Sequence, residues 1–150
     1  MKKAKIAIID YGVGNLKSIK KAIEHFGASA KITNEKNVIE ESDAIVLPGV
    51  GAFPDAMAEL KQRKYILKAV KEKPVLGICL GMQLFFTESE EVKLTKGLNL
   101  IKGRVVRLPN TVKVPQMGWN TMKIKAKKSR LLKNIKNNEY FYFVHSYYCA

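Results

Sequence analysis

The residues best suited to chemistry surround Cys79. Gly77 lies two positions before it and Gly81 two positions after it, which gives the spacing G-x-C-x-G. This spacing is the cysteine form of a nucleophile elbow, a sharp strand-to-helix turn that holds the nucleophile in strained backbone geometry. A side chain on either glycine would clash in such a turn, and the following helix N-terminus favours thiolate over thiol. A lone cysteine is more often a small buried hydrophobe, but the two glycines and their flanks favour a nucleophile here.

The elements that must position Cys79 are a short strand before it and an apolar helix after it. The strand is expected over residues 75–78, and the helix continues from Leu80 through Phe86. Earlier in the chain, apolar β-branched runs predict strands at residues 5–10, 28–33 and 43–47. A first helix is predicted from apolar residues at helical spacing and ends at Gly27. A second helix is predicted to begin with Asn34 as its cap, and a third covers residues 55–73. The first helix's apolar positions are Leu16, Ile19, Ile23 and Phe26. This alternation predicts an α/β fold, an open and mostly parallel sheet flanked by helices.

The second half of the chain favours additional antiparallel β structure. A hairpin-like pair of strands is expected over residues 97–108, around Lys102-Gly103. A strand from residue 112 leads into a turn that carries the single tryptophan, and an aromatic strand covers residues 139–149. A short helix is expected over residues 131–135, and the acidic residues 87–91 are expected at a solvated end.

Two glycine-containing turns follow predicted strands. Pro48-Gly49-Val50-Gly51 permits backbone geometry that other residues resist and lets N–H groups face a ligand. The carboxyl ends of strands are where open α/β sheets bind ligands, although a plain strand-helix turn is the simpler interpretation. The turn over residues 11–15 superficially suggests a phosphate loop. It lacks the third glycine of a dinucleotide fingerprint and the Gly-Lys-Ser/Thr of a P-loop, so we expect no nucleotide site there.

The chain has 150 residues, the length of one domain with a hydrophobic core. Two cysteines in a chain of this length do not make a disulfide framework. The first residues lack a signal-peptide pattern, and no apolar run reaches membrane-spanning length. We therefore expect a cytoplasmic protein without membrane contact.

The net charge of +14 raises the question of nucleic-acid binding. The densest group of cations has no interleaved aromatic residues and fits no nucleic-acid module. A solvated lysine-rich face is the preferred interpretation and a docking surface for an acidic partner is the second, so nucleic acid is not an expected partner. This group consists of Lys123, Lys125, Lys127, Lys128, Arg130, Lys133 and Lys136.

Five segments together resemble the class I (triad) glutamine amidotransferases, which have a flavodoxin-like fold. Within that class they are similar to the glutaminase subunits of imidazole glycerol-phosphate synthase, from histidine biosynthesis. The segments occur in the family's order and extend over almost the whole chain. They are Asp10-Tyr11-Gly12-Val13-Gly14-Asn15, Leu47-Pro48-Gly49-Val50-Gly51-Ala52-Phe53, Gly77-Ile78-Cys79-Leu80-Gly81-Met82-Gln83, Pro115-Gln116-Met117-Gly118-Trp119-Asn120 and Tyr142-Phe143-Val144-His145-Ser146-Tyr147.

The resemblance implies a mechanism in which Cys79 attacks the side-chain amide of glutamine, with no metal and no cofactor. Ammonia would then pass through a channel to a (β/α)8-barrel cyclase partner. Backbone N–H groups would form the oxyanion hole, and the peptide of the glycine turn would reorient to complete it. The oxyanion-hole residues would be Leu80, Val50 and Gly51. The substrate-binding residues would be Gly49, Gln83, Glu91, Ser146 and Tyr147. The interface residues near the channel would be Trp119 and Asn120, although a core anchor is the alternative for Trp119.

The chain departs from the family in two places. The family takes its general base and orienting carboxylate from a His-Pro-Glu segment downstream of Val-His-Ser-Tyr. These 150 residues contain no such segment, and neither His25 nor His145 matches it. We therefore expect residues 1–150 to form an amidotransferase domain incomplete at its C-terminus, without the final strand and helix. Such a chain should expose apolar sheet surface, dissolve poorly and be inactive alone. The second departure is Gln116, where histidine-pathway members commonly carry histidine.

These departures leave two alternatives to the glutaminase of histidine biosynthesis. Gln116 slightly favours a related branch that supplies ammonia for the amination of a surface-sugar precursor. The absent base favours a non-catalytic docking module, while the intact elbow favours an enzyme.

Overall fold

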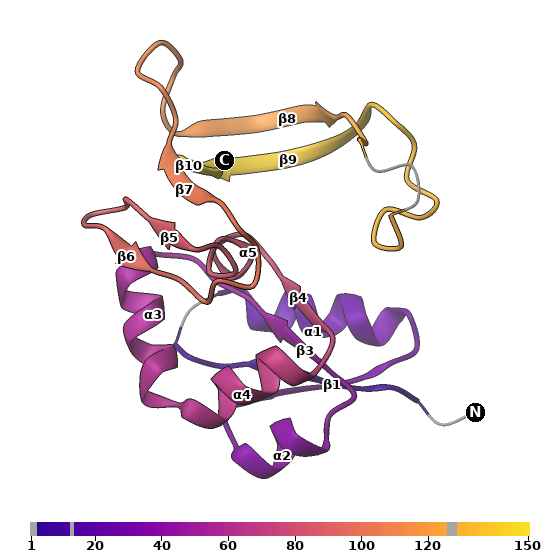
Figure 1. Ribbon diagram of the computed structural model, residues 1–150. Helices are drawn as coiled ribbons and strands as arrows, with labels where there is room; N and C mark the ends of the chain where they lie inside the picture. The colour runs from indigo at the N-terminus through magenta and orange to yellow at the C-terminus, as the bar shows by residue number, and fades with distance from the viewer. Residues whose placement is uncertain (1–2, 13, 126–128) are drawn as a thin grey trace. The chain divides into compact units, whose positions relative to one another are not determined.

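The computed structural model describes residues 3–12, 14–125 and 129–150 (Figure 1). Val13 of the first family segment, and Lys127 and Lys128 of the cation group, lie outside these residues. The chain forms two compact units, Met1–Val106 with Cys149–Ala150, and Arg107–Tyr148. Each unit is described separately.

A four-stranded parallel sheet forms the centre of the first unit. Its strands are β1 (Lys5–Ile9), β2 (Ser29–Thr33), β3 (Ala44–Leu47) and β4 (Val75–Gly77), in the spatial order β2-β1-β3-β4. Most of the apolar side chains of β1 and β3 are buried, as the β-branched runs predicted, with Ile8, Ile9 and Leu47 fully inaccessible. On β4, Leu76 is 39% exposed. The chain reverses its direction across the sheet between β1 and β3, so the loops after these two strands flank the crevice where such sheets bind ligands.

Helices cover both faces of this sheet (Figure 1). Right-handed crossovers place α1 on one face and the next three helices on the other, because β2 and β3 lie on opposite sides of β1. The helices are α1 (Leu16–His25), α2 (Lys36–Glu41), α3 (Phe53–Gln62), α4 (Lys64–Glu72) and α5 (Leu80–Gln83). The open, mostly parallel α/β sheet predicted from the sequence is therefore confirmed.

Helix α1 confirms most of its predicted pattern. Asn15 caps its first turn by accepting a hydrogen bond from the Ser18 N–H, and Gly27 ends it with a φ of +86°. Its apolar face packs on Ile8, Ala30 and Val46 through Leu16, Ile19 and Ile23. Phe26 does not join this core, since its side chain is 87% exposed. It instead borders an apolar groove of about 390 Å³ that includes Leu76 and Ile78 at the edge of the sheet, so apolar sheet surface is exposed as expected.

Three helix boundaries differ from the sequence prediction. Helix α2 begins at Lys36, with Glu35 at its N-cap, and the side chain of Asn34 does not cap it. Instead the Thr33 hydroxyl accepts a hydrogen bond from the Glu35 N–H at 2.9 Å, which turns the chain out of β2. Residues 55–73 form two helices that break at Arg63. Helix α5 ends at Gln83, because the chain turns there towards a second sheet.

That second sheet has the order β10-β7-β5-β6, with β5 (Glu88–Ser89), β6 (Thr95–Lys96), β7 (Arg104–Arg107) and β10 (Tyr147–Cys149). The predicted hairpin around Lys102-Gly103 is wrong. Strand β7 pairs in parallel with β5 and does not form an antiparallel hairpin with the strand before it in the sequence. The prediction of a solvated acidic end is also wrong for Ser89, which is fully buried. Glu88 forms a 2.9 Å ion pair with Arg104 across the parallel pair.

The second unit contains an antiparallel pair, β8 (Gln116–Met122) and β9 (Glu139–His145). This confirms the additional antiparallel region. Trp119 lies within β8 rather than in a turn, directly opposite Tyr142, and the two rings meet edge to face at 5.6 Å. The predicted helix over residues 131–135 is a series of turns instead.

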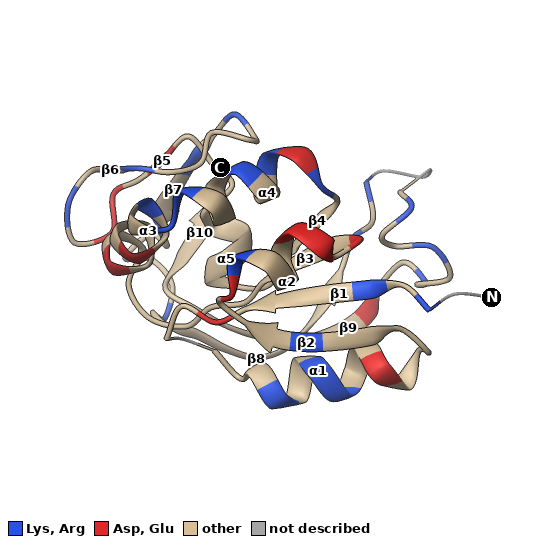
Figure 2. Ribbon diagram, turned by 90° about the horizontal axis from the view of Figure 1, so that it is seen from below, with Lys and Arg blue, Asp and Glu red and all other residues tan. Residues whose placement is uncertain are grey.

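Positive charge is spread over many elements rather than gathered on one. Lys and Arg occur on β1, β2, α1, α4 and β7 (Figure 2). In the described parts of the chain, none of the helices is both long and apolar enough to span a bilayer.

Candidate active site

The backbone at Cys79 has the strained geometry that the elbow spacing predicted. Its φ is +54° and its ψ is −115°, a combination that residues with a side chain rarely adopt. The thiol is exposed. Two hydrogen bonds fix the turn around it, from the Ile78 N–H to the Leu47 carbonyl at 2.9 Å and from the Gly81 N–H to the Ile78 carbonyl at 3.0 Å. Strand β4 and helix α5 thus present the thiol of Cys79, the predicted nucleophile, at the carboxyl edge of the sheet.

The two glycines of the elbow are sterically required. A methyl group at Gly77 would lie 2.6 Å from the backbone of Met82, in the first turn of α5. A methyl group at Gly81 would lie 1.9 Å from the carbonyl oxygen of Leu47, the last residue of β3. Both distances are far below van der Waals contact, so the elbow closes on itself and against β3 only because these positions lack side chains.

The glycine turn after β3 lies directly against the elbow. Gly49 is buried, and a methyl group there would lie 2.9 Å from Leu80 Cβ and 3.2 Å from the Gly81 nitrogen. Gly51 has a φ of +106°, and Val50 is 58% exposed. The structure therefore brings together the predicted nucleophile and the predicted oxyanion segments. The Leu80 N–H is at the first position of α5, where the helix itself offers no acceptor.

Tyr11 is a site residue to which the sequence analysis gave no role. Its hydroxyl donates a hydrogen bond to the Pro48 carbonyl, and its side chain is almost completely buried. Burial, and secondly the nearby charge of Cys79, raise the pKa of Tyr11 well above its usual value. Its position directly after the first strand, in the same edge of the sheet as the elbow, is the signal that could have identified it.

Glu91 lies beside the other end of the glycine turn. Its Oε2 accepts a hydrogen bond of 2.8 Å from the Phe53 N–H, the first residue of α3. The Glu91 N–H donates to the hydroxyl of Ser89 at 3.1 Å, which ties the loop to the buried strand β5. A carboxylate here also complements the positive end of the α3 dipole. Sequence reasoning found Glu91 through the family resemblance but missed this contact, which joins residues 38 positions apart.

Gln83 is buried on α5, one helical turn beyond Cys79, and its N–H donates to the Cys79 carbonyl at 3.1 Å. It thus lies on the elbow itself, as predicted.

The remaining predicted site residues belong to the second unit. Trp119 is 67% exposed and Asn120 pairs with Phe141 across β8 and β9. The Ser146 carbonyl accepts a hydrogen bond from the Leu108 N–H, and the Tyr147 carbonyl lies 2.9 Å from Nδ1 of His145. Their proposed roles in substrate binding and at the interface stay predictions. The other histidine, His25, meets the ring of Phe26 edge to face at 5.3 Å.

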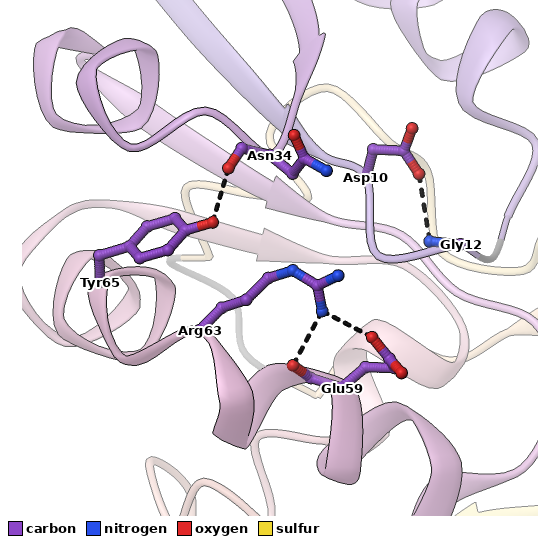
Figure 3. Close-up of polar contacts among 6 residues, drawn as sticks. All are labelled: Asp10, Gly12, Asn34, Glu59, Arg63 and Tyr65. Carbon is purple, nitrogen blue, oxygen red and sulfur yellow. Dashed lines mark hydrogen bonds and ion pairs between the residues drawn. The ribbon is translucent and has the colours of Figure 1, made fainter.

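Figure 3 shows polar contacts in the loops after β1 and β2 and at the junction of α3 and α4. The Tyr65 hydroxyl donates to the Asn34 carbonyl at 2.6 Å, and the Gly12 N–H donates to Asp10 Oδ1 at 3.1 Å. At the junction, the Arg63 guanidinium lies 2.6 Å from the Glu59 carboxylate and 3.0 Å from the Glu59 carbonyl. The contact of Tyr65 joins α4 to the loop after β2, and that of Arg63 closes the C-terminal end of α3, so neither belongs to the glycine turn.

Across the described ranges, no three His, Cys, Asp or Glu residues lie close enough together to hold a metal ion.

Comparison with known proteins identifies a family and several proteins that this chain resembles. The family profile described as "Glutamine amidotransferase class-I" matches residues 7–150. A protein of Caldanaerobacter subterraneus subsp. tengcongensis, named "Imidazole glycerol phosphate synthase subunit HisH", is 51% identical over 147 residues, which cover 95% of this chain and 72% of that protein. A protein of the same name from Archaeoglobus fulgidus is 51% identical over 144 residues, with the same coverage.

Two solved structures share the fold. A putative GMP synthase protein from Thermoplasma acidophilum has a TM-score of 0.69 at 18% identity, covering 99% of this chain and 68% of that one. A protein described as glutamine amidotransferase has a TM-score of 0.65 at 16% identity, covering 93% of this chain and 70% of that one.

Proposed function

The chain belongs to the class-I glutamine amidotransferase family, and we propose that it is a glutaminase subunit that supplies ammonia to a synthase in histidine biosynthesis. The observation that carries this proposal is the strained Cys79 elbow packed against the glycine turn. The proposal of the pathway rests on relatives that are about half identical in sequence and are named as a subunit of imidazole glycerol phosphate synthase.

The chemistry is acyl transfer through a thioester. The Cys79 sulfur attacks the carboxamide carbon of glutamine, and the carbonyl electrons move onto oxygen. When the tetrahedral intermediate collapses, the C–N bond breaks and the nitrogen leaves as ammonia after taking up a proton. Water then attacks the thioester carbon, which releases glutamate and restores the thiol.

The oxyanion of that intermediate is the charge that the backbone must stabilise. We assign this role to the N–H of Leu80 and to an N–H of Val50 or Gly51 in the glycine turn. Loss of one such donor costs about 3 kcal/mol of transition-state stabilisation in comparable enzymes. The turn lies against the elbow, which supports this assignment.

We assign substrate binding to two groups of residues. Gly49 and Gln83 adjoin the elbow, while Ser146 and Tyr147 would bind the amino-acid end of glutamine. Glu91 would accept the substrate ammonium. Its Oε2 already accepts from the Phe53 N–H, and a carboxylate has lone pairs for a second donor on Oε1.

The thiol proton requires a base. In the family this base and its carboxylate come from a His-Pro-Glu segment, which these 150 residues do not contain. His25 and His145 lie at other family positions, so we assign neither of them to proton transfer.

The ammonia acceptor is assigned to a partner protein. We propose a cytoplasmic heterodimer with a (β/α)8-barrel cyclase, whose overall reaction is that of a lyase, with Trp119 and Asn120 at the interface. The exposed indole of Trp119 suits such a contact. The names of the relatives favour this pathway over amination of a surface sugar, and the intact elbow argues against a purely docking role.

A glutamine-analogue electrophile, 6-diazo-5-oxo-L-norleucine, tests the proposal. We expect it to alkylate Cys79 in the full-length gene product bound to its partner, with free glutamine protecting the thiol. The Cys149→Ser variant should be labelled as fast as the parent, and Cys79→Ser should not be labelled. Peptide mapping by mass spectrometry reads the position. Labelling of Cys149 instead, or no protection by glutamine, would contradict the proposal.

A further inference from the structure

The glycine turn of residues 48–52 is anchored at both ends by side chains from distant parts of the chain. At its start, the Pro48 carbonyl accepts a hydrogen bond from the Tyr11 hydroxyl. At its end, the Phe53 N–H donates to the Glu91 carboxylate at 2.8 Å. Both Pro48 and Phe53 are fully buried. The two ends of the turn are therefore fixed to the core of the first unit.

Between these anchors, the middle of the turn is much less restrained. Val50 is 58% exposed, and among the described residues, chain neighbours aside, nothing lies within 4 Å of where a methyl group on Gly51 would be. Gly49, by contrast, has no such space. A methyl group there would lie 2.8 to 3.2 Å from atoms of Tyr11, Leu80 and Gly81. Reorientation of peptides is thus possible at residues 50 and 51 while Pro48 stays in place.

We propose that the Tyr11 hydroxyl is a positioning group for the oxyanion hole, because it holds the Pro48 carbonyl and so keeps the N–H groups of the glycine turn aligned with Cys79. This inference rests on the proposed glutaminase function. In this role Tyr11 acts through the backbone of the turn, by its hydrogen bond to the Pro48 carbonyl.

The surroundings of Tyr11 suit a permanent anchor. Its ring is buried, and the adjoining loop supports the same turn, since a methyl group at Gly14 would lie 3.2 Å from Pro48 Cβ. Burial, and secondly the charge of Cys79, raise the pKa of Tyr11, which favours the protonated hydroxyl that acts as a donor. A buried carbonyl left without this donor would lose a hydrogen bond that water cannot replace.

Tyr65 provides a matched control. Its hydroxyl also donates to a backbone carbonyl, that of Asn34, at 2.6 Å. This contact belongs to the loop after β2 and is not part of the elbow or the glycine turn. Tyr65→Phe removes the same chemical group from a more exposed hydrogen bond, so it controls for the loss of a tyrosine hydroxyl away from the glycine turn.

The experiment compares Tyr11→Phe and Tyr65→Phe in the full-length gene product bound to its synthase partner. We expect Tyr11→Phe to lower kcat for glutamine hydrolysis about tenfold with KM changed less than about twofold, because the hole is misaligned only in the transition state. Tyr65→Phe should leave both constants within about twofold of the parent. The rate of Cys79 alkylation by iodoacetamide should be equal in all three proteins, since that reaction forms no oxyanion.

The outcomes separate the two levels of inference. A parent complex that does not hydrolyse glutamine refutes the proposed function. If the parent is active but Tyr11→Phe and Tyr65→Phe have equal kcat, only the role of Tyr11 is refuted. That role is also refuted if Tyr11→Phe slows the alkylation of Cys79 as much as it lowers kcat. Amide hydrogen exchange on the parent needs no variant. Slow exchange at Phe53 with fast exchange at Val50 and Gly51 supports the anchored turn, and equal protection of all three contradicts it.

Discussion

Substitution of Gly81 by alanine is the most direct test of how the elbow is built. The added methyl group would lie 1.9 Å from the Leu47 carbonyl oxygen and 2.6 Å from its carbonyl carbon. A third close contact, at 2.9 Å, is with the Pro48 carbonyl oxygen. These atoms are all backbone, at the buried end of β3, so no side chain can rotate away to make room.

The magnitude follows from this geometry. Helix α5 and strand β3 must separate by roughly 1.5 Å to restore van der Waals contact, and overpacking of a well-packed core typically costs about 1–3 kcal/mol. Because rigid backbone lies on both sides, we expect the upper end, about 3 kcal/mol of unfolding free energy. For a chain of this size that corresponds to a fall in Tm of roughly 6–12 °C. A displacement of about 1 Å at Cys79 should also lower glutaminase activity about 100-fold.

Urea denaturation and glutamine turnover of the partner complex measure the two effects. The control is Gly27→Ala, at the end of α1, where φ is +86°. Apart from the adjacent residues, nothing in the described part of the chain lies within 4 Å of the new methyl group. This substitution carries only the cost of a left-handed backbone, about 1 kcal/mol, and should leave turnover unchanged. If Gly81→Ala costs no more than Gly27→Ala, or keeps parental turnover, the elbow is not packed against β3 in the way its glycines require.

Three further predictions concern the chemistry at the site. Glutamate release should be detectable only when the chain is extended by the family's His-Pro-Glu segment, and equal turnover by the 150-residue chain would show that its own residues supply the base. At neutral pH iodoacetamide should modify Cys79 before Cys149. Cys79 is exposed, whereas burial raises the pKa of Cys149 and so lowers its thiolate fraction. Mapping of the alkylated peptides measures the order, and modification of Cys149 first would contradict the prediction. Glu91→Gln should raise KM for glutamine by about 10- to 100-fold with little change in kcat, since a charge-assisted hydrogen bond to the substrate ammonium is lost, and steady-state kinetics that show a fall in kcat alone would refute that role.

The short-range features of this protein could be predicted from its sequence because each is fixed by neighbouring residues. The glycines two positions on either side of Cys79 are needed by any strand-to-helix turn that holds a side chain at φ +54°. Apolar β-branched runs separated by helical periodicity led to the parallel sheet. The helix expected over residues 131–135 failed because a few apolar residues at helical spacing do not nucleate a helix without a surface to pack on.

What only the tertiary structure decided is how distant segments meet around the elbow. The bond from Tyr11 to Pro48 joins residues 37 positions apart, and that from Phe53 to Glu91 joins residues 38 apart. Strand β7 pairs in parallel with β5, a partner that a hairpin pattern does not suggest. Such contacts depend on the order of strands in the sheet, which local residue preferences do not encode. The sequence by itself therefore determined the strained turn that presents the Cys79 thiol, whereas folding determined which side chains anchor the glycine turn beside it.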